Sequence, residues 1–321
     1  MTTLITGLTG QDGGYLAEQL IAAGEHVIGL VHPHDPLPAN VVALQPHGAL
    51  TLVACELADP AAFRHVLKET APTRVYHLAA QSVPLQCERD PLGSRNINVV
   101  SCEVLVEWLR REQHGGRVLL ASSAAVFGHE ATAPQSEQTP SNPDSEYGRQ
   151  KQTVRQLASA AREEGLFVAC AIPFNHESER RSEDFVFAKV CNSVARIALG
   201  QQLGLRLGSL MPRRDWGYAP EYAQAMAWML EVPTPLELVL GTGESHSVEE
   251  LARAACAVAE LDFSAVVASD MAIVVEHAHG IPELRADPAL AWKELGWEAH
   301  TKFAALVERL VNAALEQDRV G

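Results

Sequence analysis

Short apolar runs and amphipathic stretches alternate along the first half of the chain. The apolar, β-branched runs predict buried strands over residues 3–6, 27–31, 50–54, 74–78, 118–121 and 166–172. Between them, apolar positions recur at helical spacing and predict helices over residues 12–23, 60–70, 92–113 and 145–164. This alternation is typical of a parallel sheet covered by helices on both faces. We therefore predict an α/β fold with a doubly wound, Rossmann-like parallel sheet.

The pattern changes after residue 172, where a charged segment is followed by a predicted helix over residues 185–199. Ser247 and Glu250 have the spacing of a capping box, and residues 287–317 predict two helices around a turn at Gly296. We predict a dinucleotide-binding domain from residues 1–172 with about 213–242. A smaller, mainly helical substrate domain is expected from residues 173–212 and 243–321. The proline-containing loop over residues 128–143 is expected to form a pocket wall.

Composition narrows the possible partners. The 321-residue chain has 25 Lys and Arg against 40 Asp and Glu, a net charge of −15, which disfavours nucleic acid and anionic membranes as partners. Its six cysteines show no CxxC pair, so neither a zinc site nor a disulfide framework is indicated. No apolar run approaches the roughly 18 residues of a membrane span, and no signal peptide precedes the first predicted strand. We expect a cytoplasmic protein.

A glycine-rich turn joins the first predicted strand to the first predicted helix. Its sequence is Gly7-Leu8-Thr9-Gly10-Gln11-Asp12-Gly13. Glycines at this spacing let the backbone approach a pyrophosphate and hold it at a helix N-terminus. A simple tight turn is the alternative, but the position between strand and helix favours a dinucleotide site.

The ends of the next predicted strands bear on the choice of dinucleotide. The second ends in Val31-His32-Pro33-His34-Asp35, with an acid and no arginine, which favours NAD over NADP. His32 and His34 could form a metal pair, but no third ligand accompanies them, and we predict no metal site. Glu56 and Leu57 follow the third strand, where an acid could meet the adenine amine. The fourth strand ends in Leu78-Ala79-Ala80-Gln81-Ser82. The small residues of this segment could leave room for a cofactor, or they could only pack under a helix.

Tyr147 and Lys151 stand four residues apart at the start of a predicted helix, so their side chains share one face. A lysine ammonium beside a tyrosine hydroxyl favours loss of the phenolic proton, and the tyrosine can then take a proton from a sugar hydroxyl. Ser123, after the fifth strand, adds a hydroxyl that can hold the reacting oxygen. Together with the glycine turn, these residues indicate a dehydrogenase-type site.

At this point the sequence resembles the extended short-chain dehydrogenase/reductases that act on nucleotide sugars, and within them the GDP-mannose 4,6-dehydratases. The resemblance covers nearly the whole chain and rests on TGLTGQDGGYLAE (6–18), LAAQS (78–82), PFNHESERR (173–181), RRDWGYA (213–219) and KELGW (293–297). It implies cofactor contacts at the glycine turn, Glu56, Leu57, Leu78, Ser82, Tyr147, Lys151, His176 and Arg181. It implies nucleotide-sugar contacts, GDP-linked for this family, at Ser82, Asn175, Val186, Lys189 and Arg214. His277 falls where the family has an arginine that holds the substrate diphosphate.

The chain departs from the family at Ala125. The dehydratases have a Thr-Ser-Glu or Thr-Asp-Glu run where this chain reads Ser123-Ala124-Ala125, and eliminating water requires an acid and a base that alanine cannot supply. The run resembles that of C4 epimerases, which need only the Tyr, Lys and hydroxyl residues. The segment Ile281-Pro282-Glu283-Leu284, followed by Asp287-Pro288, is closer to the GDP-4-keto-6-deoxymannose reductases, which are 4-ketoreductases. We therefore expect hydride transfer at C4 of a nucleotide hexose, by an epimerase or a ketoreductase.

Two alternatives stay open. One is a 4,6-dehydratase that recruits another group, such as Glu130 or His129. The other is a catalytically idle dinucleotide-binding protein, which the intact Ser123, Tyr147 and Lys151 argue against. The family's Arg-rich loop after the second strand, which binds a 2′-phosphate and helps build a tetramer, is replaced here. NAD and a homodimer are therefore expected, the dimer pairing the helices at residues 92–113 and 145–164.

Overall fold

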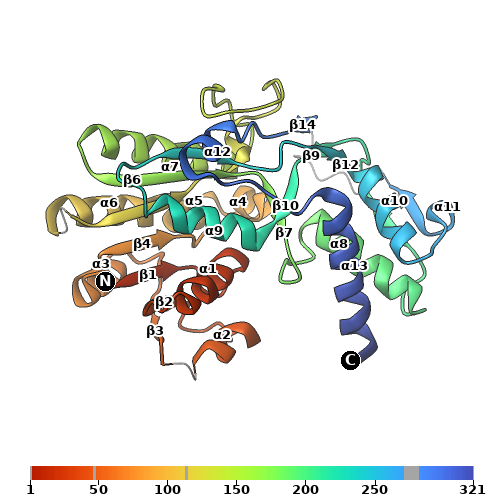
Figure 1. Cartoon of the computed structure of the whole chain (residues 1–321), viewed down its shortest axis with the longest axis horizontal. Coiled ribbons are helices and arrows are strands. Elements are labelled where there is room, and N and C mark those ends of the chain that lie inside the picture. The colour runs from red at the N-terminus through yellow and green to blue at the C-terminus, as the bar shows by residue number, and fades with distance from the viewer. Residues whose placement is uncertain (1, 46–47, 113–114, 271–281, 321) are drawn as a thin grey trace.

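A seven-stranded parallel sheet forms the centre of the computed structural model, which describes residues 2–45, 48–112, 115–270 and 282–320 (Figure 1). The strand order is β11-β6-β5-β4-β1-β2-β3, and every neighbouring pair is parallel. Because the order reverses between β1 and β4, the connections leave in opposite directions there and open a crevice at the carboxyl ends of these strands. The strands are β1 (Thr3–Thr6), β2 (Val27–Val31), β3 (Leu50–Ala54), β4 (Arg74–His77), β5 (Arg117–Ala121), β6 (Phe167–Pro173) and β11 (Glu237–Leu240). The predicted doubly wound α/β fold is confirmed.

Helices cover both faces of the sheet. One apolar layer joins the strands to α3 (Pro60–Thr70), α6 (Ser101–Glu112) and α7 (Glu146–Glu163) through residues such as Phe63, Leu105 and Val154. The opposite layer is built on α1 (Gln11–Ala22), α2 (Ala39–Leu44), α9 (Ala219–Met229) and α12 (Ala289–Leu295). Since β11 pairs with β6 and α9 packs on α1, residues 219–240 complete the sheet layer. The division into two domains stays a prediction.

The predicted helix over residues 92–113 is wrong in its continuity. The structure has α4 (Pro84–Arg89), α5 (Pro91–Arg95), a π-helical turn at Asn96–Val100 and then α6. The wider turn carries Asn98 inward, where its buried amide bonds the backbone of Gln81. Hydrophobic spacing cannot show this turn, because the interaction that favours it lies outside the helix.

A smaller unit lies beside the sheet (Figure 1). Its apolar core joins α8 (Val186–Ala198), α10 (Val248–Val258) and α13 (Phe303–Val320), with α11 (Phe263–Val266) at its edge. The short strands are β7 (Asn175–Glu177), β8 (Leu205–Leu207), β9 (Arg213–Arg214), β10 (Trp216–Tyr218), β12 (His246–Ser247), β13 (Val267–Ser269) and β14 (Glu283–Leu284). The capping box of Ser247 and Glu250 is confirmed, as are the two final helices around Gly296, whose φ is +65°.

A buried carboxylate joins the sheet to this unit. Asp215 follows β9 and is fully buried. Its two oxygens accept hydrogen bonds from the backbone N–H groups of Thr242, Gly243 and Ala286 and from the Thr242 hydroxyl. Because burying a carboxylate costs free energy unless its oxygens are satisfied, this arrangement holds three segments in fixed positions. Among the described residues, no helix is both long and apolar enough to cross a membrane.

Candidate active site

A cavity of about 670 Å³ opens at the carboxyl ends of the central strands and gathers most of the residues that the sequence singled out. The predicted residues that line it are Gly7, Thr9, Gly10, Gln11, Asp12, Gly13, His32, Glu56, Leu57, Leu78, Ala79, Ala80, Ser82, Ser123, Tyr147, Lys151, Asn175, His176, Arg181 and Arg214. Val186 and Lys189, on α8, are not among its lining residues, although the preceding Phe185 is. His277 lies outside the described residues. The loop at residues 128–143 supplies no described lining residue, so its predicted role as a pocket wall is wrong.

The loop at residues 128–143 supports the cavity indirectly, by holding the segment that contains Leu284. Gln135 is fully buried and exchanges backbone hydrogen bonds with Arg285 and Asp287, and its side-chain oxygen accepts from the Arg285 N–H. These bonds hold the chain around Leu284, which does line the cavity. The loop is thus a support and not a wall.

The glycine turn leaves no room for side chains. A Cβ at Gly7, whose φ is +72°, would lie 2.7 Å from the Ala79 nitrogen, and a Cβ at Gly13 would lie 2.2 Å from the Gly7 oxygen. Gly10 is the N-cap of α1 and provides no side-chain cap. The first turn of the helix is therefore left for an external acceptor. Such a tight, uncapped turn fits the pyrophosphate of a dinucleotide.

A chain of hydrogen bonds fixes the floor of the cavity. The Ala79 N–H donates to Thr6 Oγ1, Thr6 Oγ1 lies 3.0 Å from His77 Nδ1, and His77 Nε2 lies 2.8 Å from Ser101 Oγ. Burial, aided by the charge of Lys151, lowers the pKa of His77 to about 3, so the imidazole is neutral. It accepts at Nδ1 from Thr6 and donates at Nε2 to Ser101, whose hydroxyl donates to the Ile97 carbonyl. The ends of β1 and β4 are thereby held together.

Asp12 and His176 form a buried pair at the start of α1, with His176 Nε2 3.0 Å from both Asp12 oxygens. Burial by itself opposes charge on both groups, but their mutual attraction wins: it leaves the pKa of Asp12 below and that of His176 above the ordinary value. The His176 ring also stacks on Tyr222, with ring centroids 4.7 Å apart. The pair anchors β7 to the glycine turn.

Arg181 provides a cation beside this pair. Its guanidinium lies over the Phe185 ring, 3.4 Å from the centroid, and its Nε lies 3.4 Å from Glu177 Oε2. Glu177 is almost wholly inaccessible, and burial raises the pKa of its carboxyl to about 7 even though Arg181 and His176 oppose the shift. Arg181 is held by stacking and by this carboxylate while it lines the cavity, which suits a phosphate contact.

At the far end of the cavity, His32 bridges two carboxylates. Its Nε2 lies 2.9 Å from Glu56 Oε2 and its Nδ1 3.3 Å from Asp35 Oδ1. The rings of His32 and His34 meet edge to face, with centroids 5.8 Å apart. In the part of the chain that the structure describes, no three metal-binding side chains gather at one place. His32 therefore belongs to a hydrogen-bonded acid cluster at the position that faces a cofactor ribose in this fold.

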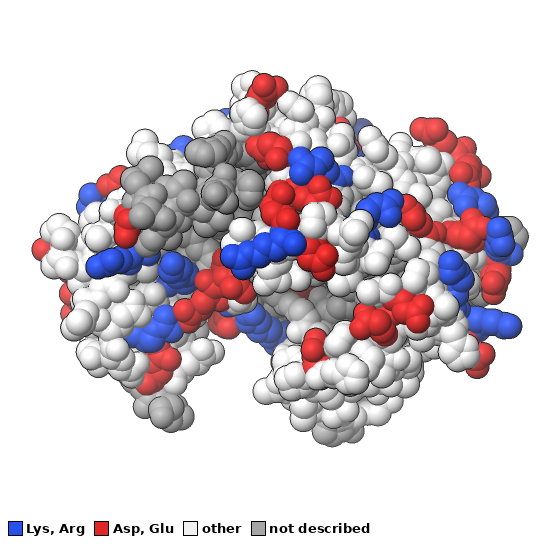
Figure 2. Space-filling model, turned by 180° about the vertical axis from the view of Figure 1, so that it is seen from behind, with Lys and Arg blue, Asp and Glu red and all other residues white. Residues whose placement is uncertain are grey.

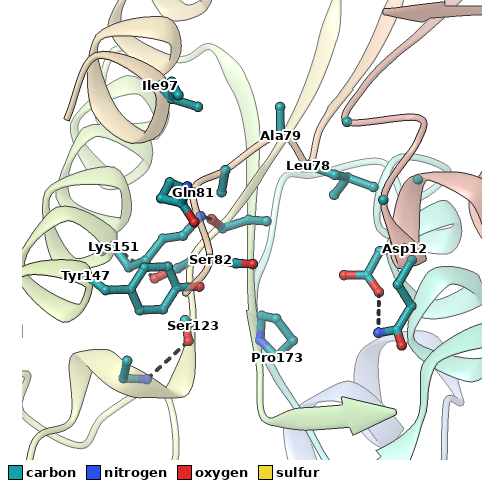
Figure 3. Close-up of a pocket in the computed structure, with 18 of the residues that line it drawn as sticks. Asp12, Leu78, Ala79, Gln81, Ser82, Ile97, Ser123, Tyr147, Lys151 and Pro173 are labelled. Atoms are coloured by element: carbon teal, nitrogen blue, oxygen red, sulfur yellow. Dashed lines mark hydrogen bonds between the residues drawn. The ribbon is translucent and has the colours of Figure 1, made fainter. Parts of the chain in front are cut away.

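The predicted catalytic side chains come together near the middle of the cavity. Figure 3 shows the hydroxyls of Ser82, Ser123 and Tyr147 directed into the same space, with Lys151 behind the tyrosine ring. Lys151 is buried; its Nζ donates to the Ala121 carbonyl at 2.8 Å and lies 5.7 Å from the Tyr147 ring centroid. A phenol and a cation placed together beside a cavity are the groups that general acid–base catalysis by tyrosine requires.

A buried amide pair positions this group and was missed by sequence reasoning. Asn98 accepts from the Gln81 N–H and donates to the Gln81 carbonyl and to Gln150 Oε1, at 2.8, 3.1 and 2.7 Å. Gln150 precedes Lys151 on α7, so the clamp ties the segment of Ser82 to the helix of Tyr147 and Lys151. No local signal marks Asn98, because its partners are distant in sequence.

The lining of the cavity also includes Asn175, Arg214, Asp144 and the Ser123–Ala125 turn. Burial lowers the pKa of Arg214 to about 10, and the charge of Asp144 acts in the opposite direction. The guanidinium remains positive at neutral pH and could pair with an anionic group in the cavity. Asp144, three residues before Tyr147, was also missed, and that proximity is the signal that could have revealed it.

Residues 4–310 match the family described as GDP-mannose 4,6 dehydratase. The chain belongs to this family. It is 34% identical over 325 residues to GDP-mannose 4,6 dehydratase 2 of Arabidopsis thaliana, covering 98% of this chain and 86% of that protein. It is 36% identical over 264 residues to the Homo sapiens GDP-mannose 4,6 dehydratase, covering 77% of this chain and 69% of that protein. The protein is therefore an NAD(P)-dependent enzyme of the nucleotide-sugar epimerase/dehydratase group.

Solved structures share the fold. The Thermus thermophilus UDP-glucose 4-epimerase in complex with NAD superimposes with a TM-score of 0.84 at 24% identity, covering 98% of this chain and 99% of that one. RMD from Pseudomonas aeruginosa complexed with NADPH superimposes with a TM-score of 0.81 at 23% sequence identity, covering 98% of this chain and 99% of that one. Proteins of this fold thus hold either dinucleotide. The face in Figure 2 intersperses acidic and basic side chains among neutral ones.

Proposed function

We propose that this enzyme transfers hydride at C4 of a nucleotide-linked hexose, as a 4-epimerase or a 4-ketoreductase, and that the substrate is GDP-linked. The observation that carries the proposal is the convergence of Ser123, Tyr147 and Lys151 in a cavity built for a dinucleotide. Ala125, in the turn beside them, supplies no acid or base. Hydride transfer at a carbinol carbon needs only a group that takes or returns the hydroxyl proton.

Each side chain then has a defined task. Tyr147 takes the proton from the C4 hydroxyl, or returns it to the ketone. Lys151, held by the Ala121 carbonyl, places a cation beside the phenol, and Ser123 orients the reacting oxygen. A bound NAD(P) would supply the hydride acceptor and donor. The glycine turn, Glu56, Leu57, Leu78, His176 and Arg181 would hold it, while Asn175 and Arg214 would contact the nucleotide sugar.

NAD is the proposed dinucleotide. His32, Asp35 and Glu56 place two carboxylates in one cluster at the end of β2 and β3. Carboxylates accept hydrogen bonds from ribose hydroxyls and repel a 2′-phosphate, which in this fold is met by arginine. Calorimetric titration should therefore show tighter binding of NAD than of NADP. The double variant Glu56→Gln, Asp35→Asn should have a smaller ratio between these two affinities. Equal affinities in the wild type would refute this part of the proposal.

A 4,6-dehydratase that uses a substitute acid or base is the second candidate, favoured by the family match over residues 4–310. Glu130 is exposed and accepts a hydrogen bond from the Asn142 amide at 2.8 Å. His129 is paired with Asp144, 3.1 Å away. A catalytically idle dinucleotide-binding protein is disfavoured by the assembled Ser123, Tyr147 and Lys151.

A mass-resolved assay distinguishes these activities. Purified enzyme is incubated with GDP-mannose and, separately, with UDP-glucose, each with NAD or NADP. An isomer of unchanged mass indicates the epimerase, loss of water indicates the dehydratase, and a requirement for a 4-keto sugar with reduced dinucleotide indicates the ketoreductase. Tyr147→Phe should lower turnover by about 100-fold or more, the usual share of a general acid or base. Turnover by Tyr147→Phe equal to that of the wild type would refute the assigned mechanism.

We also propose a homodimer that pairs α5, α6 and α7 with the same helices of a second copy. The proposal rests on the family resemblance and on Leu92 of α5, whose side chain is 78% exposed. Light scattering should give the mass of a dimer, and Leu92→Glu should shift it toward the monomer. A wild-type monomer at micromolar concentration would contradict the pairing.

A further inference from the structure

Asp144 is a described carboxylate of the cavity lining whose charge acts on Arg214, a proposed substrate contact. The other lining carboxylates among the described residues lie toward the dinucleotide: Asp12 pairs with His176, and Asp35 and Glu56 gather around His32. Asp144 instead shares the cavity wall with Ser123, Ala125 and Tyr147. Hydride transfer at C4 does not require a carboxylate at this place, so Asp144 is available for a different chemical role.

The local packing sets Asp144 beside the turn that contains Ala125. Ser145 caps α7 by accepting from the Gly148 N–H at 3.1 Å. A Cβ at Gly148 would lie 2.6 Å from the Ala125 oxygen and 2.9 Å from Pro143 Cβ. The first turn of α7 and the residues before it are thus pressed against the Ser123–Ala125 turn. Asp144, between Pro143 and Ser145 in this packed segment, lines the cavity together with Ala125.

Asp144 also has a partner that connects it to solvent. His129 Nδ1 lies 3.1 Å from Asp144 Oδ2, and the two side chains are 50% and 34% exposed. His129 is not among the cavity-lining residues, whereas Asp144 is. The imidazole is thus placed between the carboxylate and bulk water, while the carboxylate lines the cavity.

We propose that Asp144, served by His129, is a second proton-transfer group of this enzyme, acting on a carbon next to C4. The proposal rests on the proposed function, because only a C4 ketone makes the hydrogens on C3 and C5 acidic. It assigns to Asp144 and His129 an activity that Ser123, Tyr147 and Lys151 do not provide.

The step balances without a further reactant. An Asp144 oxygen takes a proton from the carbon beside the C4 ketone, the electron pair of the broken C–H bond forms a C–C double bond, and the carbonyl electrons move to O4. Ser123 and Tyr147 donate hydrogen bonds to this enolate oxygen. Return of a proton from Asp144 reverses the step. Exchange through His129 makes that proton one from solvent, so nothing is oxidised or reduced.

Deuterium uptake tests the proposal. The enzyme with its dinucleotide is incubated in D₂O with GDP-mannose, UDP-glucose or dTDP-glucose, and the recovered sugar is examined by mass spectrometry and by NMR at C3 and C5. The wild type should incorporate deuterium at one of these carbons. Asp144→Asn should lower incorporation by about 100-fold or more, and His129→Gln should lower it less. Glu130→Gln, a carboxylate on the same loop outside the cavity lining, should incorporate like the wild type.

Two further readouts separate this role from a structural one. Nucleotide-sugar affinity measured by calorimetry should change by less than about threefold in Asp144→Asn, as for a group that acts in chemistry and not in binding. Reduction of the dinucleotide, followed by nicotinamide absorbance, should persist in Asp144→Asn. If the enzyme acts as a 4,6-dehydratase, loss of water from the sugar should also require Asp144.

The outcomes are distinct. Dinucleotide reduction with no deuterium uptake in the wild type overturns this inference and leaves the proposed function standing. Deuterium uptake by Asp144→Asn at the wild-type rate, or its loss in Glu130→Gln, also overturns it. No reduction and no exchange with any of the three sugars, with or without a 4-keto sugar supplied, overturns the proposed function and this inference together.

Discussion

Replacing Gly13 with alanine tests the cradle that the glycine turn forms. The new Cβ would lie 2.2 Å from the Gly7 oxygen, where ordinary contact begins at 3.4 Å. The turn must therefore open by about 1.2 Å to relieve the overlap. All three close neighbours are backbone atoms, of Gly7 and Leu8, so no side-chain rotation can absorb the change. The first turn of α1 then moves away from the position of a pyrophosphate.

The expected loss follows from that displacement. One charge-assisted hydrogen bond is worth about 1.5–3 kcal/mol. Losing one weakens dinucleotide binding by about 10- to 100-fold. The overlap itself should lower the free energy of unfolding by about 1–3 kcal/mol. Calorimetric titration with NAD measures the first effect and urea unfolding the second.

Gly24→Ala is the matched control. Gly24 follows α1 with a φ of +86°, and a Cβ added there would have no neighbour within 4 Å. Alanine at this position should cost about 1 kcal/mol of stability for its left-handed conformation and leave dinucleotide affinity unchanged. The reasoning is refuted if Gly13→Ala binds NAD as tightly as the wild type, or if both variants lose affinity equally.

Two further substitutions test buried groups. Burial raises the pKa of the Glu177 carboxyl from 4.5 to about 7, so the free energy of unfolding of the wild type falls as pH rises through this interval. Glu177→Gln removes this carboxyl, and its free energy of unfolding, measured with urea, should fall less over the same pH interval. An identical pH dependence would contradict the assigned burial effect. Asn98→Leu should lower the free energy of unfolding by about 3 kcal/mol or more, because the Gln81 backbone groups and the Gln150 Oε1 oxygen lose a partner. Near-wild-type stability by the same method would show that the clamp is not needed.

Local pattern was sufficient for much of the architecture. The strands from β1 to β6, the glycine turn at the start of α1 and the capping box of α10 all follow from side chains close together in sequence. Hydrophobic spacing and turn chemistry act over a few residues, so they can be recognised without a structure. The spacing of Tyr147 and Lys151 and the place of Ser123 after the fifth strand were enough to predict a dehydrogenase-type site.

Tertiary structure decided what depends on distant partners. The π-helical turn at Asn98 exists beside a strand end and a helix that are remote in sequence, and β11 joins the sheet from residues 237–240. Asp144 gains its proposed role only because the loop returns His129 to it and α7 packs on Ala125. Glu177 is an ordinary acid in sequence and a buried one in the fold. Burial and long-range hydrogen bonds are properties of the packed chain, and so no local pattern records them.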